Sequence, residues 1–220
     1  MAKSSAARKL AEIESPLRLQ RAAFGGGAPT PPVRPNLPIL NNARLAVIML
    51  LAAELMFFAG LIGAFLVFRL SATVWPPPFQ PRLPVGVTGV NSLILVFSAL
   101  TMHWAVIAGR AGVAANLVRQ MTFTALLGAL FLLIQGYEWM RLVHFGLTTS
   151  SSVYGGLFYT LIGAHGAHVF GGLIWLVIVC WQAKRGRFTK TDFVGVQTAR
   201  MYWTFVVALW PVLYGLVYLY

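Results

Sequence analysis

One carboxylic acid lies in the middle of the first long apolar stretch of the sequence, within the segment AELMFFAG at residues 53–60. No Lys or Arg lies inside this apolar run, so Glu54 has no cation of its own segment to pair with. A charged group at the centre of a membrane helix costs about 2.5 to 3.5 kcal/mol. We therefore expect Glu54 to be protonated, buried against other helices or beside water, and treat it as a candidate functional residue. A neutral carboxyl that only hydrogen-bonds a neighbouring helix also fits.

Two further pairs of polar residues have helical spacing within apolar segments. His165 and His168 are three residues apart, and so are Gln135 and Glu138. Residues at this spacing share one face of a helix. Together with Glu54, the four side chains could build a polar cluster inside the membrane. We expect Gln135, Glu138, His165 and His168 to form an interhelical hydrogen-bonded network.

Other chemistry for this cluster has less support in the sequence. Two His and two Glu are ligand types of metal sites in helix bundles, but the Glu-x-x-His pair of such sites is absent and Gln135 is a poor ligand. A proton or substrate pathway would suit a transporter, yet we find neither inverted repeats nor paired interrupted helices. The sequence also contains no nucleophile with an adjacent base, no phosphate-binding loop and no haem attachment motif. We expect no catalytic residue, cofactor site or metal site in this chain.

Small residues follow a regular spacing in the fourth apolar segment. Gly163, Ala167 and Gly171 lie four residues apart. Small side chains on one face of a membrane helix let another helix approach closely. The spacing therefore predicts a helix-packing face at these three positions.

The composition places these residues in a membrane protein. Of the 220 residues, 58 % are hydrophobic and only 10 % are charged, which is too apolar for an ordinary soluble domain. Five apolar runs reach about the 20 residues that a bilayer requires. They cover residues 45–68, 87–109, 120–140, 153–181 and 198–219. Only helices can satisfy their backbone groups there, so we predict an all-α membrane protein with a bundle of five transmembrane helices.

The basic residues predict how the bundle is oriented. The net charge is +12, but the Lys and Arg residues lie at segment ends rather than along one face, which argues against a nucleic-acid partner. Fourteen of them fall on one side of the predicted bundle and three on the other. The N-terminus is therefore expected in the cytoplasm and the C-terminus on the opposite side. Residues 1–43 form a basic arm with a Gly/Pro-rich linker, and residues 44–220 form the bundle.

Motifs in the five segments resemble subunit III of haem-copper terminal oxidases. They include ELMFFAG at 54–60, NSLIL at 91–95, QGYEW at 135–139, YGGLFY at 154–159 and HGAHV at 165–169. Five spans, rather than the seven of the longest members, resemble the short bacterial forms that lack the first two helices. The resemblance runs from about residue 45 to the end of the chain and leaves the basic arm uncovered.

The resemblance implies a non-catalytic subunit III of a bacterial haem-copper oxidase in the cell (inner) membrane, in aerobic respiration. Such an oxidase couples electron transfer to dioxygen with proton translocation. The resemblance also implies that haem and copper are held by partner subunits and not by this chain. The implied partners are the catalytic subunit I in direct contact, other oxidase subunits, bound membrane phospholipid and a larger respiratory supercomplex. The family's carboxylate that matches Glu54 lies near a lipid-filled cleft proposed to lead oxygen toward subunit I. The resemblance thus implies a supporting role for Glu54 in oxygen access and proton uptake.

The last segment departs from the family pattern. Gln197, Thr204 and Val207 stand where the family usually has Glu, His and Asp. Their spacing predicts that they lie near one face of a helix, and we infer that this face meets a different neighbour, either lipid or a partner subunit. Two alternative functions stay open, namely a subunit III-like accessory protein of a nitric oxide reductase and an independent membrane transporter. The electron donor, cytochrome c or quinol, is not identified by the sequence.

Overall fold

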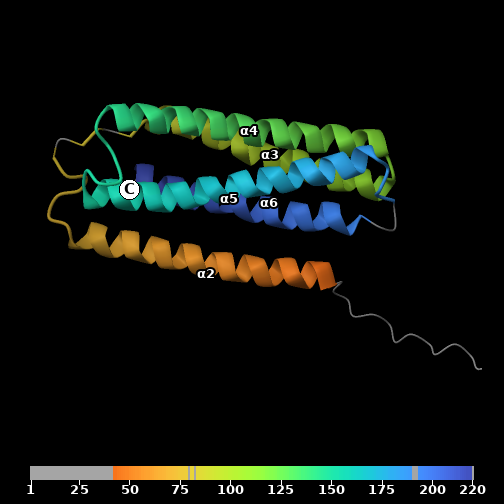
Figure 1. Cartoon of the computed structure of the whole chain (residues 1–220), viewed down its shortest axis with the longest axis horizontal. Coiled ribbons are helices and arrows are strands. Elements are labelled where there is room, and N and C mark those ends of the chain that lie inside the picture. The colour runs from red at the N-terminus through yellow and green to blue at the C-terminus, as the bar shows by residue number, and fades with distance from the viewer. Residues whose placement is uncertain (1–41, 79, 82, 190–192, 220) are drawn as a thin grey trace, which may run out of the picture. The chain divides into compact units, whose positions relative to one another are not determined.

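A computed structural model describes residues 42–78, 80–81, 83–189 and 193–219 of the chain. Five long helices make up most of this part, and a π-helical segment, η1, follows the last of them (Figure 1). Their bounds are α2 (Asn42–Ser71), α3 (Val85–Ala111), α4 (Ala114–His144), α5 (Val153–Lys184), α6 (Val194–Tyr214) and η1 (Gly215–Leu219). All five are long and apolar enough to cross a membrane, so the predicted all-α bundle of five transmembrane helices is confirmed. The basic arm before residue 42 lies outside the described residues, and the orientation of the bundle stays a prediction.

The helices extend beyond the apolar runs from which they were predicted. The clearest case is α4, which begins at Ala114 rather than near residue 120. The extra stretch, residues 114–119, contains Asn116 and Arg119, which lower the local hydropathy, while its Ala, Leu and Arg residues are good helix formers. Hydropathy therefore locates the part of a helix that lies in hydrocarbon and underestimates the length of the whole helix.

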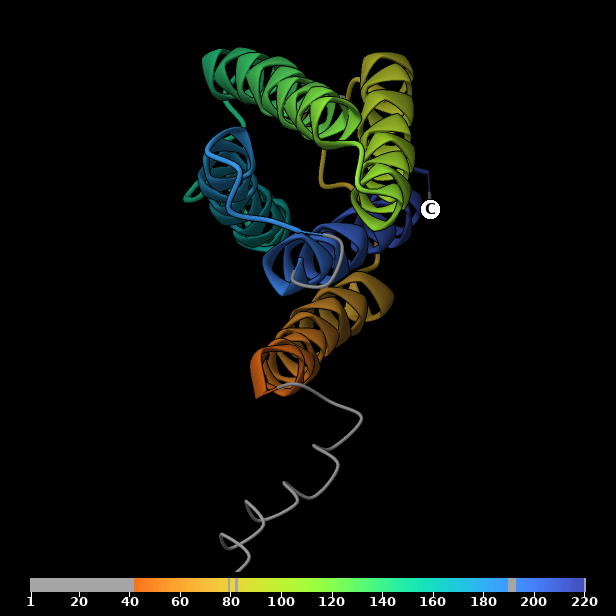
Figure 2. The same ribbon diagram turned by 90° about the vertical axis from the view of Figure 1, so that its right-hand side faces the viewer.

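Four of the helices form a closed ring. α3 contacts α4, α4 contacts α5, α5 contacts α6, and α6 contacts α3. Figure 2 shows this ring end-on, with α2 attached outside it, against α6. α2 contacts α5 as well as α6, but only 11 % of its most apolar segment is buried, against 44 % for α3 and α6. Most of the α2 surface is therefore left to lipid or to a partner chain.

Two tryptophans of α6 form the centre of the ring. Trp203 and Trp210 are both fully buried. The Nε1–H group of Trp203 donates to Ser98 Oγ at 3.0 Å, and that of Trp210 donates to Ser92 Oγ at 2.7 Å, both on α3. Each indole thus buries a large apolar ring while its one polar group has a partner.

Two glycines make room for Trp203. A Cβ atom at Gly128 of α4 would lie 2.6 Å from Trp203 Cη2. A Cβ atom at Gly172 of α5 would lie 3.2 Å from Trp203 Cε3 and 3.0 Å from Tyr202 Cε1. α4 therefore approaches the Trp203 ring more closely than a side chain at Gly128 would allow, and α5 approaches it at a distance that is tight for a Cβ atom.

The predicted packing face at Gly163, Ala167 and Gly171 is not used within this chain. No atom lies within 4 Å of a Cβ built at Gly163 or Gly171, and Ala167 and Gly171 are exposed. Spacing alone shows which residues share a face but not the direction of that face. Within this chain Gly172, about 100° further around the helix, is the residue that faces α6, and the packing face at the three small residues stays a prediction for a neighbouring chain.

Substitution of Gly128 by Ala should destabilise the bundle. The added methyl group meets the rigid, fully buried Trp203 ring, and overpacking of this kind typically costs about 1–3 kcal/mol. Gly136→Ala in the same helix is the matched control, because no atom lies within 4 Å of its Cβ position. The control should leave the free energy of unfolding unchanged or raise it by up to about 1 kcal/mol, because Ala has a higher helix propensity than Gly. The measurement is the free energy of unfolding in detergent, and equal stability of the two variants would contradict this packing.

Candidate functional site

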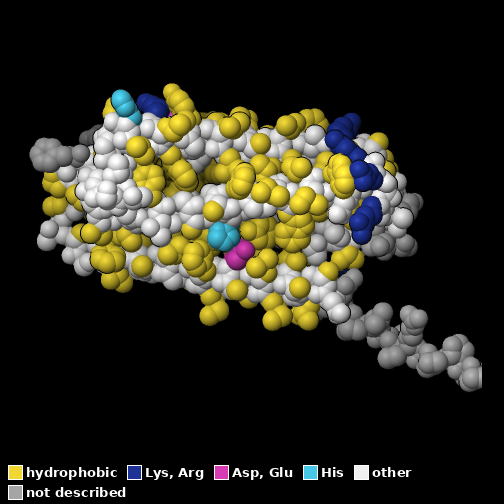
Figure 3. Space-filling view, in the orientation of Figure 1, with side chains coloured by type: hydrophobic (Ala, Val, Ile, Leu, Met, Phe, Trp, Pro, Cys, Tyr) yellow, Lys and Arg dark blue, Asp and Glu magenta, His cyan; other side chains and the backbone are white. Residues whose placement is uncertain are grey.

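Glu54 of α2 faces His168 of α5. Glu54 Oε1 lies 3.9 Å from His168 Nε2, and the side chains are 12 % and 25 % exposed. Glu54 is twelve residues into α2, about 18 Å from the start of the helix, so the pair lies well inside the membrane. Figure 3 shows an acidic and a histidine side chain next to each other amid mostly hydrophobic side chains. The carboxyl thus has a titratable partner at the outer surface of the bundle.

The backbone of α5 determines which nitrogen of His168 faces the carboxyl. His168 Nδ1 lies 2.7 Å from the carbonyl oxygen of Ala164. A carbonyl oxygen can only accept, so Nδ1 carries the proton of that bond. In a neutral ring the Nε2 lone pair therefore points toward Glu54. The carboxyl oxygen and the Nε2 atom thus face each other at a distance longer than a direct hydrogen bond.

Aromatic residues surround this pair. Phe57 stacks on the His168 ring at 5.9 Å, and Phe58 meets the same ring edge-on at 5.0 Å. Tyr202 of α6 interacts with the Glu54 carboxyl. Glu54 Oε2 has no hydrogen-bond partner among the described residues. Tyr202 is the residue of this site that sequence reasoning missed, because its contact with Glu54 depends on how α6 packs against α2.

The predicted network partners of His168 lie elsewhere. Gln135 Nε2 donates to the Tyr218 hydroxyl at 3.2 Å. Glu138 forms an ion pair at 3.3 Å with Arg141, in the next turn of α4. The described hydrogen bonds therefore do not join Gln135 and Glu138 to the Glu54–His168 pair, although all four residues were expected in one polar cluster.

His165 has a different environment from His168. It is 1 % exposed and stacks on Trp210, with ring centroids 5.0 Å apart. Neither ring nitrogen has a hydrogen-bond partner among the described residues. The position is thus a packed aromatic contact, and the described hydrogen bonds do not connect it to Gln135, Glu138 or His168.

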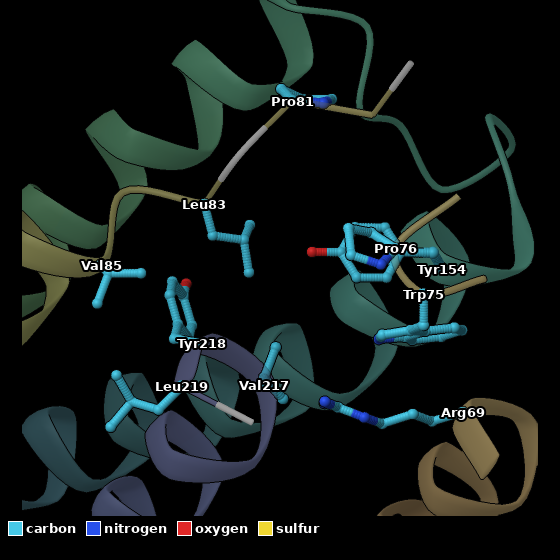
Figure 4. Close-up of a pocket in the computed structure, with 10 residues that line it drawn as sticks. All are labelled: Arg69, Trp75, Pro76, Pro81, Leu83, Val85, Tyr154, Val217, Tyr218 and Leu219. Atoms are coloured by element: carbon cyan, nitrogen blue, oxygen red, sulfur yellow. The ribbon is translucent and has the colours of Figure 1, made fainter. Parts of the chain in front are cut away.

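A pocket of about 270 Å³, lined mainly by apolar residues, lies at the end of the bundle where α2 ends (Figure 4). Arg69, Tyr154 and Tyr218 are among the residues that line it. Arg69 Nη1 donates to the carbonyl oxygen of Leu216 at 3.1 Å, and Figure 4 shows the Tyr154 hydroxyl pointing into the pocket. Through Tyr218 the pocket reaches Gln135. This arrangement can hold water or a small polar group, and it supplies no nucleophile with an adjacent base.

Metal-binding side chains are not gathered anywhere in the described part of the chain. No group of three or more His, Cys, Asp or Glu residues there could hold a metal ion. Glu54 and His168 supply two such groups and Tyr202 a phenol. The chemistry open to the site is accordingly proton binding and hydrogen bonding.

The three residues that depart from the family pattern do not share one surface. Gln197 Oε1 accepts a hydrogen bond from Arg44 Nη2. Thr204 is exposed two turns further along α6. Val207, in contrast, is 4 % exposed and packs in the core. The hypothesis of a single altered face therefore applies to Gln197 and Thr204 only.

Known proteins similar to this chain match it across all five helices of the bundle. The family model described as "Cytochrome c oxidase subunit III" matches residues 34–220. Cytochrome c oxidase subunit 3 of Synechocystis sp. is 40 % identical over 174 residues, which cover 79 % of this chain and 73 % of that protein. A probable cytochrome c oxidase subunit 3 of Nocardia farcinica is 39 % identical over 182 residues, which cover 81 % of this chain and 88 % of that protein. The corresponding Corynebacterium diphtheriae protein is 34 % identical over 181 residues, with the same coverage.

Glu54 and His168 should be energetically coupled across the α2–α5 contact. In a double-mutant cycle of Glu54→Leu and His168→Leu, we expect a coupling free energy of about 0.6 kcal/mol, the average for polar contacts between membrane helices. The measurement is the free energy of unfolding in mixed detergent micelles. His144→Leu, at the exposed end of α4, serves as the control partner and should be additive with Glu54→Leu. Additivity of the Glu54 and His168 variants would exclude a direct interaction.

Proposed function

The chain belongs to the cytochrome c oxidase subunit III family, and from this premise we propose that it is a supporting subunit of a bacterial haem-copper terminal oxidase. The observation that carries the proposal is the family match over residues 34–220, which includes all five helices. The chain is a multi-pass bacterial membrane protein. Within the oxidase it stabilises the catalytic subunit and supports dioxygen reduction coupled to proton translocation, with no reaction centre of its own.

The proposed partners follow from the same family relation. Haem and copper belong to partner subunits, and subunit I is the direct neighbour. Membrane phospholipid covers the rest of the bundle. The large exposed hydrophobic residues of α2 support contact with lipid or with a partner helix, since Met49, Met56 and Leu70 are each more than half exposed. Exposed apolar area of this extent is normal for a surface that faces hydrocarbon or another membrane protein.

The Glu54–His168 pair supports a specific role within that subunit. It lies at the flank of the bundle, between weakly buried α2 and the four-helix ring, and it can hold one proton. An ionisable group at this depth is costly unless it has a partner, and such groups commonly mark proton paths. We propose that Glu54 supports proton uptake and the durability of the oxidase during turnover, beside the lipid and oxygen route of the neighbouring subunit.

A tagged copy of the chain should co-purify with a haem- and copper-containing oxygen reductase. The measurement is mass spectrometry of the detergent-solubilised complex together with haem and copper analysis. Recovery of a nitric oxide reductase without a copper-containing oxidase would reject the oxidase assignment. Proteoliposomes of the single chain should move no solute, and solute uptake would instead establish the transporter function.

Glu54→Gln should leave the complex assembled but change proton uptake or shorten the active lifetime of the oxidase during turnover. The amide keeps the size and polarity of the side chain but cannot release a proton. The measurements are proton uptake by the reconstituted complex and loss of oxygen consumption with time. Glu138→Gln is the matched control, because the Glu138 carboxyl forms an ion pair with Arg141 of its own helix. This variant should keep the normal lifetime.

Two results would count against this role of Glu54. Loss of assembly in Glu54→Gln would mean that the carboxyl mainly holds helices together. Equal effects of Glu54→Gln and Glu138→Gln on turnover would show that neither carboxyl is specific to the proton step. Normal proton uptake and lifetime in Glu54→Gln would exclude the role altogether.

A further inference from the structure

Two side-chain amides are buried in the bundle, Asn91 on α3 and Gln135 on α4. Their side chains are almost fully covered, since the residues are 1 % and 4 % exposed. Asn91 Nδ2 donates to the carbonyl oxygen of Phe131 at 3.1 Å, and Gln135 Nε2 donates to the Tyr218 hydroxyl at 3.2 Å. The two amide oxygens, Asn91 Oδ1 and Gln135 Oε1, accept no hydrogen bond from the part of the chain that the structure describes. Each amide thus uses its donor and leaves a buried acceptor unused.

The two acceptors belong to one cluster of side chains. Phe131 and Gln135 are one helical turn apart on α4, so the Asn91 amide packs against the turn that carries Gln135. Tyr218 of η1 bonds with Gln135 and also interacts with the side chain of Thr88, which lies one turn before Asn91 on α3. Three segments of the chain therefore meet here. We call the four residues Thr88, Asn91, Gln135 and Tyr218 the amide cluster.

The amide cluster lies well inside the bundle. Asn91 is six residues into α3, and Gln135 is nine residues before the end of α4, so they lie about 9 Å and 14 Å from those helix ends. A buried polar atom without a partner destabilises the fold, because it has lost its hydrogen bonds to water. Buried polar atoms in proteins therefore almost always have a partner, which is either another protein group or an ordered water.

The amide cluster adjoins the pocket at the end of the bundle where α2 ends. Tyr218 lines that pocket of about 270 Å³, together with Arg69 and Tyr154 (Figure 4). The hydroxyl of the same Tyr218 accepts the hydrogen bond from Gln135. Tyr218 is carried by the π-helical segment η1, and π-helical turns are frequent at functional sites. One side chain thus connects the pocket with the buried amides.

We propose that the amide cluster binds an ordered water molecule, which enters from this pocket past Tyr218. The donors and acceptors of such a water match the cluster. Its two hydrogens donate to Asn91 Oδ1 and Gln135 Oε1, and its oxygen accepts from the hydroxyl of Tyr218 or Thr88. A buried water typically makes about three hydrogen bonds, which is the number available here. Asn91 and Gln135 are the binding residues, and Tyr218 is the residue between them and the pocket.

A cation fits the amide cluster less well than water. Side-chain carbonyl oxygens are ligands of hard cations such as Ca²⁺, but such sites also use carboxylates. Glu138 interacts with Tyr218, yet its carboxylate is already paired with Arg141 at 3.3 Å. Arg69 adds a positive charge at the adjoining pocket. The charges around the cluster therefore favour a neutral ligand.

Radiolytic hydroxyl labelling of the intact purified complex tests this site. A short X-ray pulse generates hydroxyl radicals from water, and radicals formed from a buried water react with the side chains beside it. Phe131 and Trp210 are the probes, because both are fully buried and their ring centroids are 5.1 Å apart. Trp203 is the matched reference, since it is equally buried two turns earlier in α6. We expect label at Phe131 and Trp210 and none at Trp203.

Gln135→Met should remove most of the label at Phe131 and Trp210. The methionine side chain has a similar length, but it lacks the carbonyl acceptor that binds the water. Gln120→Met is the matched control, because it makes the same chemical change in α4 about four turns away, and it should keep the wild-type label. The wild-type comparison of Trp210 with Trp203 needs no substitution, so the test also holds if the Gln135 variant does not fold.

Four results would overturn the proposal. Unlabelled Phe131 and Trp210 in the wild type would mean that the cluster is dry. Equal label at Trp203 would indicate a general opening of the bundle, and unchanged label in Gln135→Met would separate the water from the amides. A thermal unfolding midpoint that rises with Na⁺ or Ca²⁺ in the wild type but not in Gln135→Met would assign the cluster to a cation. The label is read on this chain alone, so the result is independent of which complex contains it.

Discussion

The burial of two indole rings determines how α6 lies in the bundle. Trp203 and Trp210 are two helical turns apart, and their acceptors Ser98 and Ser92 are six residues apart on α3. These separations are about 10 Å and 9 Å along their helices, so both hydrogen bonds can form in one register only. A shift of α6 would leave two buried N–H groups without partners, which costs free energy in hydrocarbon. Gly128 and Gly172 then allow α4 and α5 to close on the Trp203 ring.

The same register positions the candidate site. Tyr202 precedes Trp203 and so points about 100° away from it around α6, toward Glu54. His168 is positioned in turn by α5, which packs on Tyr202 and Trp203 through Gly172. Only α2, which carries Glu54, is attached mainly from one side. The Glu54–His168 pair therefore lies between the four-helix ring and a helix whose other faces are open to lipid or to a partner chain.

The sequence predicts the architecture well because a bilayer leaves few alternatives for an apolar segment of about 20 residues. It also identifies Glu54 and His168 as unusual residues, because their polarity conflicts with their surroundings. It places both in one possible polar cluster but does not reveal which members of that cluster meet, since helical spacing relates residues of one helix and not residues of two. The same limitation explains Gly163 and Gly171, whose spacing is regular but whose face points outward. Likewise, Gln135 finds its partner in Tyr218, which lies in the π-helical segment η1 after α6.

The departures from the family pattern in α6 have two separate physical consequences. Val207 lies in the apolar core, where an acidic side chain would need a buried partner, so an aliphatic residue there removes a desolvation cost. Gln197 and Thr204 line a pocket of about 470 Å³ at the end of the bundle where α2 begins, and replacement of titratable residues there changes charge rather than packing. Arg44, Arg110 and Arg200 line the same pocket, and no carboxylate of the described residues lines it with them. Val207 thus acts on the core of the bundle, whereas Gln197 and Thr204 act on the charge at one end of it, and the residues of the Glu54 site are not among those altered.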